Sequence, residues 1–77
     1  MVYVTGFDEI VIGNPYNIKA IKVDDDTWEY RQVIFSEDKV ILEQGQISED
    51  KLAEIASTAY YEGVQIVADG EMMVIRM

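Results

Sequence analysis

The side chains with the greatest chemical capacity in this 77-residue sequence are its carboxylates. Fifteen Asp and Glu residues stand against six Lys and Arg residues, which gives a formal net charge of −9, and the sequence contains neither histidine nor cysteine. The absence of these two residue types excludes Ser–His and Cys–His catalytic pairs, zinc sites built from Cys and His, and iron–sulfur clusters. Few classes of enzyme are compatible with both absences.

Carboxylates act in two well-known ways, as metal ligands and as acid–base pairs. The run Asp24-Asp25-Asp26 has the residue types that bind Ca²⁺ or Mg²⁺, but it lacks the alternating ligands, the glycine and the distal Glu of an EF-hand loop, and it is better interpreted as a charged turn. Glycoside hydrolysis by two carboxylates needs a concave pocket that raises one carboxyl pKa, and a domain of this size seldom encloses one. We predict no catalytic residue, no metal site and no bound cofactor.

A third group of polar side chains shares the solvent face of a predicted helix. The residues on that face include two acids four positions apart and a tyrosine, whose ring needs cover or a partner. We predict a partner-binding surface on this face, with the triple-aspartate turn as a second patch. Its residues are Asp50, Glu54, Thr58 and Tyr61, with Ser57 beside them, and Asp24, Asp25 and Asp26. The alternative is a solvated helix surface on which Tyr61 covers a neighbouring loop.

The helix that carries this face is predicted at about residues 48–62. Ser48 is a good N-cap, and Gly63 suits the position just beyond the C-terminus. The opposite side of the helix forms an apolar stripe, as expected for a helix packed on a sheet. The stripe consists of Leu52, Ile55, Ala56 and Ala59.

The rest of the chain reads as short strands separated by turns. We expect strands at residues 2–5, 9–12, 18–23, 27–35 and 39–43, and a C-terminal β-hairpin of residues 64–68 and 71–77 around Asp69-Gly70, a dipeptide suited to a type I′ turn. The predicted fold class is α+β, in one small globular domain of residues 1–77. It is a curved, mostly antiparallel sheet of five to seven short strands, or a partial barrel, with one amphipathic helix.

The longest predicted strand, residues 27–35, changes character along its length. One face carries Trp28, Tyr30 and Ile34, interrupted by Gln32. The other face begins polar, with Glu29 and Arg31, and ends apolar, with Val33 and Phe35. We therefore expect the far end of this strand to be covered on both sides.

The charge balance narrows the classes of partner. Direct binding to DNA or RNA depends on cations that neutralise phosphates, and anionic membrane surfaces attract basic segments, so an acidic chain with a pI near 4.1 fits neither. The sequence has no basic n-region and no apolar run long enough to span a membrane, and a chain without cysteine suits a reducing compartment. We expect a cytoplasmic protein that binds neither nucleic acid nor membrane.

Two functions follow from these features. The first is a non-enzymatic protein-binding domain that uses its acidic surface against a basic protein partner. In composition the chain is similar to small phage-encoded inhibitors that present carboxylates where a host enzyme expects phosphates. The alternative is a structural module that forms a homodimer through edge strands and Met or Tyr contacts, for which Met72, Met73 and Met77 are candidates.

Overall fold

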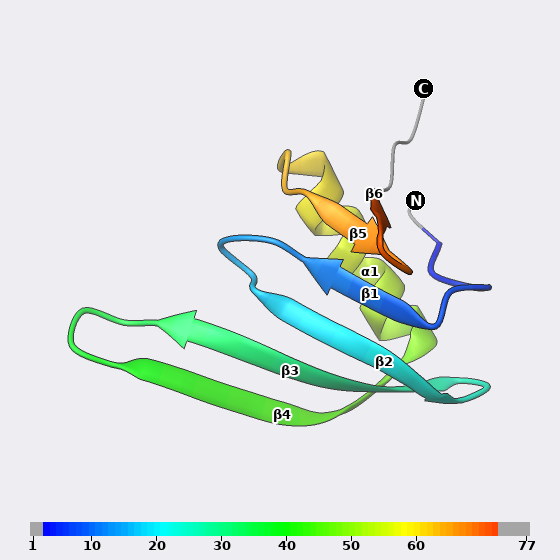
Figure 1. Ribbon diagram of the computed structural model, residues 1–77, viewed down its shortest axis with the longest axis horizontal. Helices are drawn as coiled ribbons and strands as arrows, with labels where there is room; N and C mark the ends of the chain where they lie inside the picture. Colours follow the sequence, from blue (N-terminus) through cyan, green and yellow to red (C-terminus); the bar gives the residue numbers. More distant parts are fainter. Residues whose placement is uncertain (1–2, 73–77) are drawn as a thin grey trace.

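The computed structural model describes residues 3–72 as an antiparallel sheet with one helix packed on one of its faces (Figure 1). The elements are β1 (Glu9–Ile12), β2 (Ile18–Asp24), β3 (Thr27–Phe35), β4 (Val40–Ser48), α1 (Glu49–Tyr61), β5 (Ile66–Ala68) and β6 (Glu71–Met72). The strand order is β4-β3-β2-β1-β5-β6, and all neighbouring strands are antiparallel. The α+β prediction is confirmed, and the sheet is open rather than closed into a barrel.

The core lies between α1 and the face of the sheet that it covers. Trp28 of β3 is its largest fully buried side chain, and alternate residues of β1 and β2 join it because successive strand residues point to opposite faces. Small alanines on α1 let the helix approach the sheet closely. The other buried hydrophobic residues of the described part of the chain are Val4, Ile10, Ile12, Ile18, Ala20, Leu52, Ala53, Ala56, Ala59, Ile66 and Ala68.

The helix begins and ends where its capping residues predict. The Ser48 hydroxyl accepts a hydrogen bond from the Lys51 backbone N–H at 3.2 Å, and Gly63 follows the helix with a φ of +83°. One side chain departs from the predicted solvent face. Ser57 is buried, and its hydroxyl donates to the Ala53 carbonyl at 2.8 Å, which satisfies the polar group within the packed side of the helix.

Two predicted strands differ from the structure. Residues 3–5 form no strand, although Val4 is buried, because the chain turns there and the Phe7 N–H donates to the Val4 carbonyl at 3.2 Å. At the other end, β5 and β6 pair over two residues around a turn at Asp69 and Gly70, with φ values of +50° and +82°. The rest of the predicted C-terminal hairpin, residues 73–77, lies outside the described residues. Within residues 3–72, no helix has the length and apolar character needed to cross a membrane.

The β3–β4 hairpin is longer than the rest of the sheet. The β2–β3 ladder ends at the pair Ile18–Gln32, whereas β3 and β4 pair along their full lengths. Residues 33–42 therefore form a two-stranded projection, which we call the arm; it points away from α1 (Figure 1). The expectation that the far end of β3 is covered on both sides is wrong. The helix starts directly after β4 and packs on the other end of the sheet, so it does not reach the arm.

Candidate protein-binding surface

The predicted binding residues of the helix lie in solvent. Asp50, Glu54 and Thr58 are exposed, and the Thr58 hydroxyl donates to the Glu54 carbonyl within the helix at 3.1 Å. Tyr61 is 67% exposed and meets the Tyr60 ring edge to face, with centroids 6.0 Å apart. Tyr61 is thus a mostly exposed aromatic residue on an otherwise polar surface.

Within the triple-aspartate run, Asp24 ends β2, and Asp25 and Asp26 form the exposed turn that leads into β3. The Asp24 carboxylate accepts a hydrogen bond from the Asp25 backbone N–H at 2.8 Å. The Asp26 carbonyl accepts from the Glu49 backbone N–H at 3.0 Å, so this turn and the start of α1 lie at the same end of the molecule. Among residues 3–72, no group of three acids is arranged to hold a metal ion.

The structure therefore brings together only part of the predicted surface. Asp50 lies at the end of the molecule that carries the turn, whereas Glu54, Thr58 and Tyr61 follow along the helix toward its other end. The acid at the centre of the shared end is Glu49, and its role is internal. Its carboxylate accepts hydrogen bonds at 3.4 Å from the Trp28 indole N–H, the Lys22 ammonium and the Thr5 hydroxyl.

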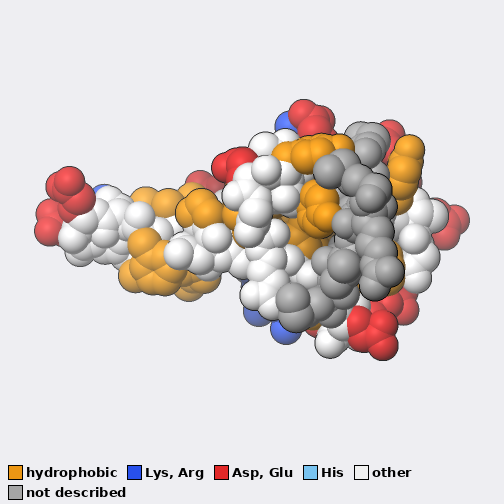
Figure 2. Space-filling view, turned by 90° about the horizontal axis from the view of Figure 1, so that it is seen from above, with side chains coloured by type: hydrophobic (Ala, Val, Ile, Leu, Met, Phe, Trp, Pro, Cys, Tyr) orange, Lys and Arg blue, Asp and Glu red, His pale blue; other side chains and the backbone are white. Residues whose placement is uncertain are grey.

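The arm presents large apolar side chains to solvent. Phe35 is 68% exposed, Leu42 77% and Val40 58%, although these are residue types that usually lie in a core. Figure 2 shows the arm extending from the body of the molecule, with hydrophobic side chains along it and acidic side chains at its tip. The arm is therefore a concentrated apolar surface on an acidic protein.

The β3–β4 register assigns the apolar side chains to both faces of the arm. The pairs Val33–Leu42 and Phe35–Val40 lie on the face opposite α1, and the pair Ile34–Ile41 lies on the same face as the helix. A strand that packs on a core from one side usually alternates apolar and polar residues. The arm breaks this alternation because all six of its paired residues are apolar.

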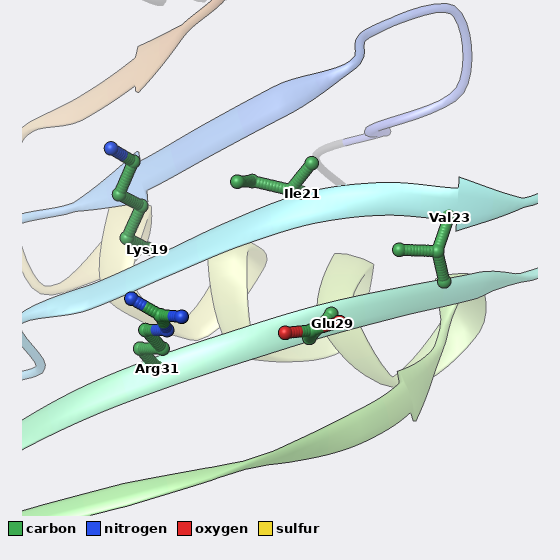
Figure 3. A pocket seen from close by; sticks show the side chains of 5 residues that line it. All are labelled: Lys19, Ile21, Val23, Glu29 and Arg31. Atoms are coloured by element: carbon green, nitrogen blue, oxygen red, sulfur yellow. The ribbon is translucent and has the colours of Figure 1, made fainter.

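The face of the sheet opposite α1, which we call the open face, continues from the arm toward β1. Next to the arm it contains a shallow hollow of about 200 Å³ lined by Lys19, Ile21, Val23, Glu29 and Arg31 (Figure 3). Ile21 and Val23 are about half exposed, and one Lys and one Arg flank them. This face combines apolar side chains with balanced charge.

The backbone of β4 is available along the edge of the sheet. The Val33 N–H donates to the carbonyl of Asn17, just before β2, so the backbone groups of Val33 point away from β4. Successive residues of a strand direct their backbone groups to opposite sides, so Gln32 and Ile34 form hydrogen bonds with β4. Their partners on β4 are Glu43 and Ile41. By the same alternation, Val40, Leu42 and Gln44 direct their N–H and C=O groups away from β3. No described strand pairs with that side of β4.

One tyrosine joins the loop between β1 and β2 to the end of the helix. The Tyr16 hydroxyl donates a hydrogen bond to the Glu62 carboxylate, and this bond raises the pKa of Tyr16 above its usual value of 10.0. The bond stabilises the neutral phenol, because ionisation would remove the donor and place two negative charges together. Tyr16 therefore has a structural role: it connects the β1–β2 loop to the end of α1.

Sequence reasoning missed the arm, although one signal for it is present. The apolar runs on both sides of the turn, residues 33–35 and 40–42, have no polar alternation, and our prediction treats only the first run, as a strand end covered on both sides. The same pattern is also expected of a hairpin whose apolar side chains are buried when it binds another chain. The predicted methionine contacts are not described, because residues 73–77 and the Met72 side chain lie outside the described part of the structure.

Comparison with known proteins adds no relative to this picture. No protein-family model, no curated protein and no solved structure matches the chain.

Proposed function

We propose that this domain is a non-catalytic protein-interaction module that binds its partner through the arm and the adjoining open face. The observation that carries this proposal is the two-stranded arm with apolar side chains on both faces. A two-stranded hairpin alone is only marginally stable in water, and clustered exposed apolar side chains mark interaction sites. A partner surface that covers the arm would stabilise the hairpin and remove its apolar side chains from water.

The distribution of charge supports the same assignment. On the open face, Lys19 and Arg31 stand among Glu9 and Glu29, so this surface is close to neutral although the chain carries −9. The centres of protein interfaces are depleted of charge and enriched in aromatic and aliphatic side chains. In this proposal, the acids of the helix and the turns keep the protein soluble while the arm is unoccupied.

Binding of a basic protein through the acidic surface is the second candidate. Its specific support is the hydrogen bond from the Glu49 N–H to the Asp26 carbonyl, which places Asp50 at the same end as the Asp24 to Asp26 turn. Such a surface suits an inhibitor or regulator that occupies a nucleic-acid-binding site. The remaining predicted residues extend away from that end, so the acidic surface is less concentrated than the arm.

Affinity capture with two variants separates the candidates. The arm variant carries Phe35→Thr and Leu42→Thr, which replace two large apolar side chains with Thr, a β-branched residue that favours strands. The helix-face variant carries Asp50→Lys and Glu54→Lys, which reverse two charges on an exposed surface. Each tagged protein is incubated with host lysate and with untagged copies of this chain, at low and at high salt.

The proposal predicts that the arm variant loses the proteins retained by the wild type, whereas the helix-face variant keeps them at both salt concentrations. The second candidate predicts the reverse: the helix-face variant loses its partner, and high salt releases that partner from the wild type, because screening weakens contacts between exposed charges. If the arm variant retains the same proteins as the wild type, the proposed function is contradicted.

A further inference from the structure

We infer that the arm binds the arm of a second copy of this chain, with β4 pairing antiparallel to itself about a two-fold axis at Ile41. This inference rests on the proposed function, because it names the partner that binds the edge of the arm. Closed two-fold dimers are the commonest assemblies of soluble proteins, and they require a surface that complements itself. The segment of residues 39–43 has that property.

Charge and hydropathy along this segment are symmetric about Ile41. The sequence reads Lys39-Val40-Ile41-Leu42-Glu43, with opposite charges at equal distances from a central apolar residue. Antiparallel pairing about Ile41 places Lys39 of each copy opposite Glu43 of the other copy, and the interface contains two such pairs. Opposite charges directly across a strand pair stabilise it, whereas like charges destabilise it.

The free edge of β4 supplies the backbone hydrogen bonds for this arrangement. Val40 and Leu42 direct their N–H and C=O groups away from β3, and the two-fold axis makes them opposite neighbours across the interface. They form hydrogen-bonded pairs, in which both residues exchange N–H···O=C bonds. Ile41 and the charged pairs occupy the alternate positions, where side chains approach each other most closely.

The apolar side chains of both arms also become continuous. On the open face, each row across the four strands contains Phe35 and Val40 of one copy and Leu42 and Val33 of the other. On the opposite face, the row consists of Ile34 and Ile41 from each copy. The exposed side chains of β4 in the arm, Val40, Ile41 and Leu42, each gain an apolar lateral neighbour from the other copy, which removes apolar area from water.

Neighbouring registers are less favourable. An axis at Leu42 places Ile41 opposite Glu43, and an axis at Glu43 places two like charges opposite each other. An axis at Gln44 brings the acidic tip of one arm, Glu37 and Asp38, alongside the acidic start of α1 in the other copy. The axis at Ile41 keeps the two bodies at opposite ends, because α1 begins at Glu49, beyond the reach of the tip of the other arm.

Charge exchange across the interface tests the register. Lys39→Glu and Glu43→Lys each replace both attractive pairs with repulsive ones, and we expect each to weaken dimerisation by about tenfold. The double variant restores opposite charges in the same register and returns dimerisation to within about threefold of the wild type. The single variants move the net charge from −9 to −11 and to −7 respectively, so a common loss is not an effect of total charge.

Sedimentation equilibrium over a concentration series measures these dimerisation constants. A cysteine provides an independent readout, because the wild-type chain has none. Ile41→Cys places two thiols directly opposite each other across the axis, within the spacing a disulfide needs, and we expect rapid dimer cross-linking on mild oxidation. Gln44→Cys is the matched control, because its thiols are separated along the strands, and it should cross-link slowly.

Failure of the double variant to recover dimerisation, or faster cross-linking at residue 44 than at residue 41, overturns the register. A wild-type chain that stays monomeric at all concentrations overturns the inference. In that case, affinity capture through the arm still tests the proposed function: arm-dependent retention of a different protein leaves the function standing with another partner, and arm-independent retention removes both.

Discussion

The arm variant, Phe35→Thr with Leu42→Thr, separates a binding role of these side chains from a role in the folded core. If the arm is a contact surface, the substitutions should lower the free energy of unfolding of the monomer by much less than a substitution in the core does. The matched core substitution is Leu52→Ala, because Leu52 is fully buried between α1 and the sheet. The two proteins should therefore differ strongly in stability.

The expected sizes follow from exposure. Complete burial of a Phe or Leu side chain contributes about 1.5–3 kcal/mol. Phe35 is 68% exposed and Leu42 is 77% exposed, so each realises about a third of that value or less in the monomer. The arm variant should then lose about 1–2 kcal/mol at most, which is an upper estimate because denatured chains also bury some area. Leu52→Ala should lose about 2–5 kcal/mol, because it also leaves a cavity.

Chemical denaturation of each protein, followed by far-UV circular dichroism and tryptophan fluorescence, measures these values. Trp28 is fully buried and reports on the core. The experiment uses two protein concentrations, because dimerisation raises the apparent stability of the wild type as concentration increases. A loss in the arm variant as large as that in Leu52→Ala, at low concentration, refutes the reasoning, because the arm side chains would then belong to the core.

Three further predictions concern the body of the domain. Glu49→Ala should cost about 1–3 kcal/mol in urea denaturation, because three side-chain donors lose their acceptor, whereas Glu54→Ala should be close to neutral; equal effects would contradict the internal role of Glu49. Gly70→Ala should cost about 1 kcal/mol in the same assay, because φ is +82° there, and an unchanged or higher stability would contradict the turn geometry. The hydrogen bond to Glu62 raises the pKa of Tyr16, so this bond stabilises the folded protein below the usual pKa of 10.0 and stops doing so as the pH rises through the raised value. The melting temperature of the wild type should therefore fall with pH above about 10, and Tyr16→Phe should make this fall less steep. An equally steep fall in Tyr16→Phe would contradict this assignment.

The predictable parts of this fold are those governed by local rules. Ser48 and Gly63 carry capping chemistry that places the ends of the helix, and Asp69 and Gly70 adopt the left-handed conformations that the dipeptide favours. Alternation along β3 assigns Trp28 to the face with Tyr30 and Ile34, and in the structure Trp28 is fully buried on that face. These features depend on near neighbours in the sequence.

The features that sequence reasoning missed depend on where the helix lies relative to the sheet. Phe35 and Val33 are apolar on the face that begins polar, which suggested cover, but the reach of α1 cannot be read from the β3 pattern. Val4 is buried without a strand because a turn brings it to the core. On the predicted helix face, Asp50, Glu54, Thr58 and Tyr61 are exposed and Ser57 is buried, but exposure does not distinguish a binding face from a solvated one.

Amide hydrogen exchange along β4, measured residue by residue by NMR at low and high protein concentration, tests the central claim most directly. The inward-facing amides of Ile41 and Glu43 should be protected at both concentrations, because they pair with β3. The outward-facing amides of Val40 and Leu42 should exchange rapidly at low concentration and become protected as the concentration rises. If these two amides exchange at the same rate across the series, while the chain still associates, the arm is not the contact surface and the account is contradicted.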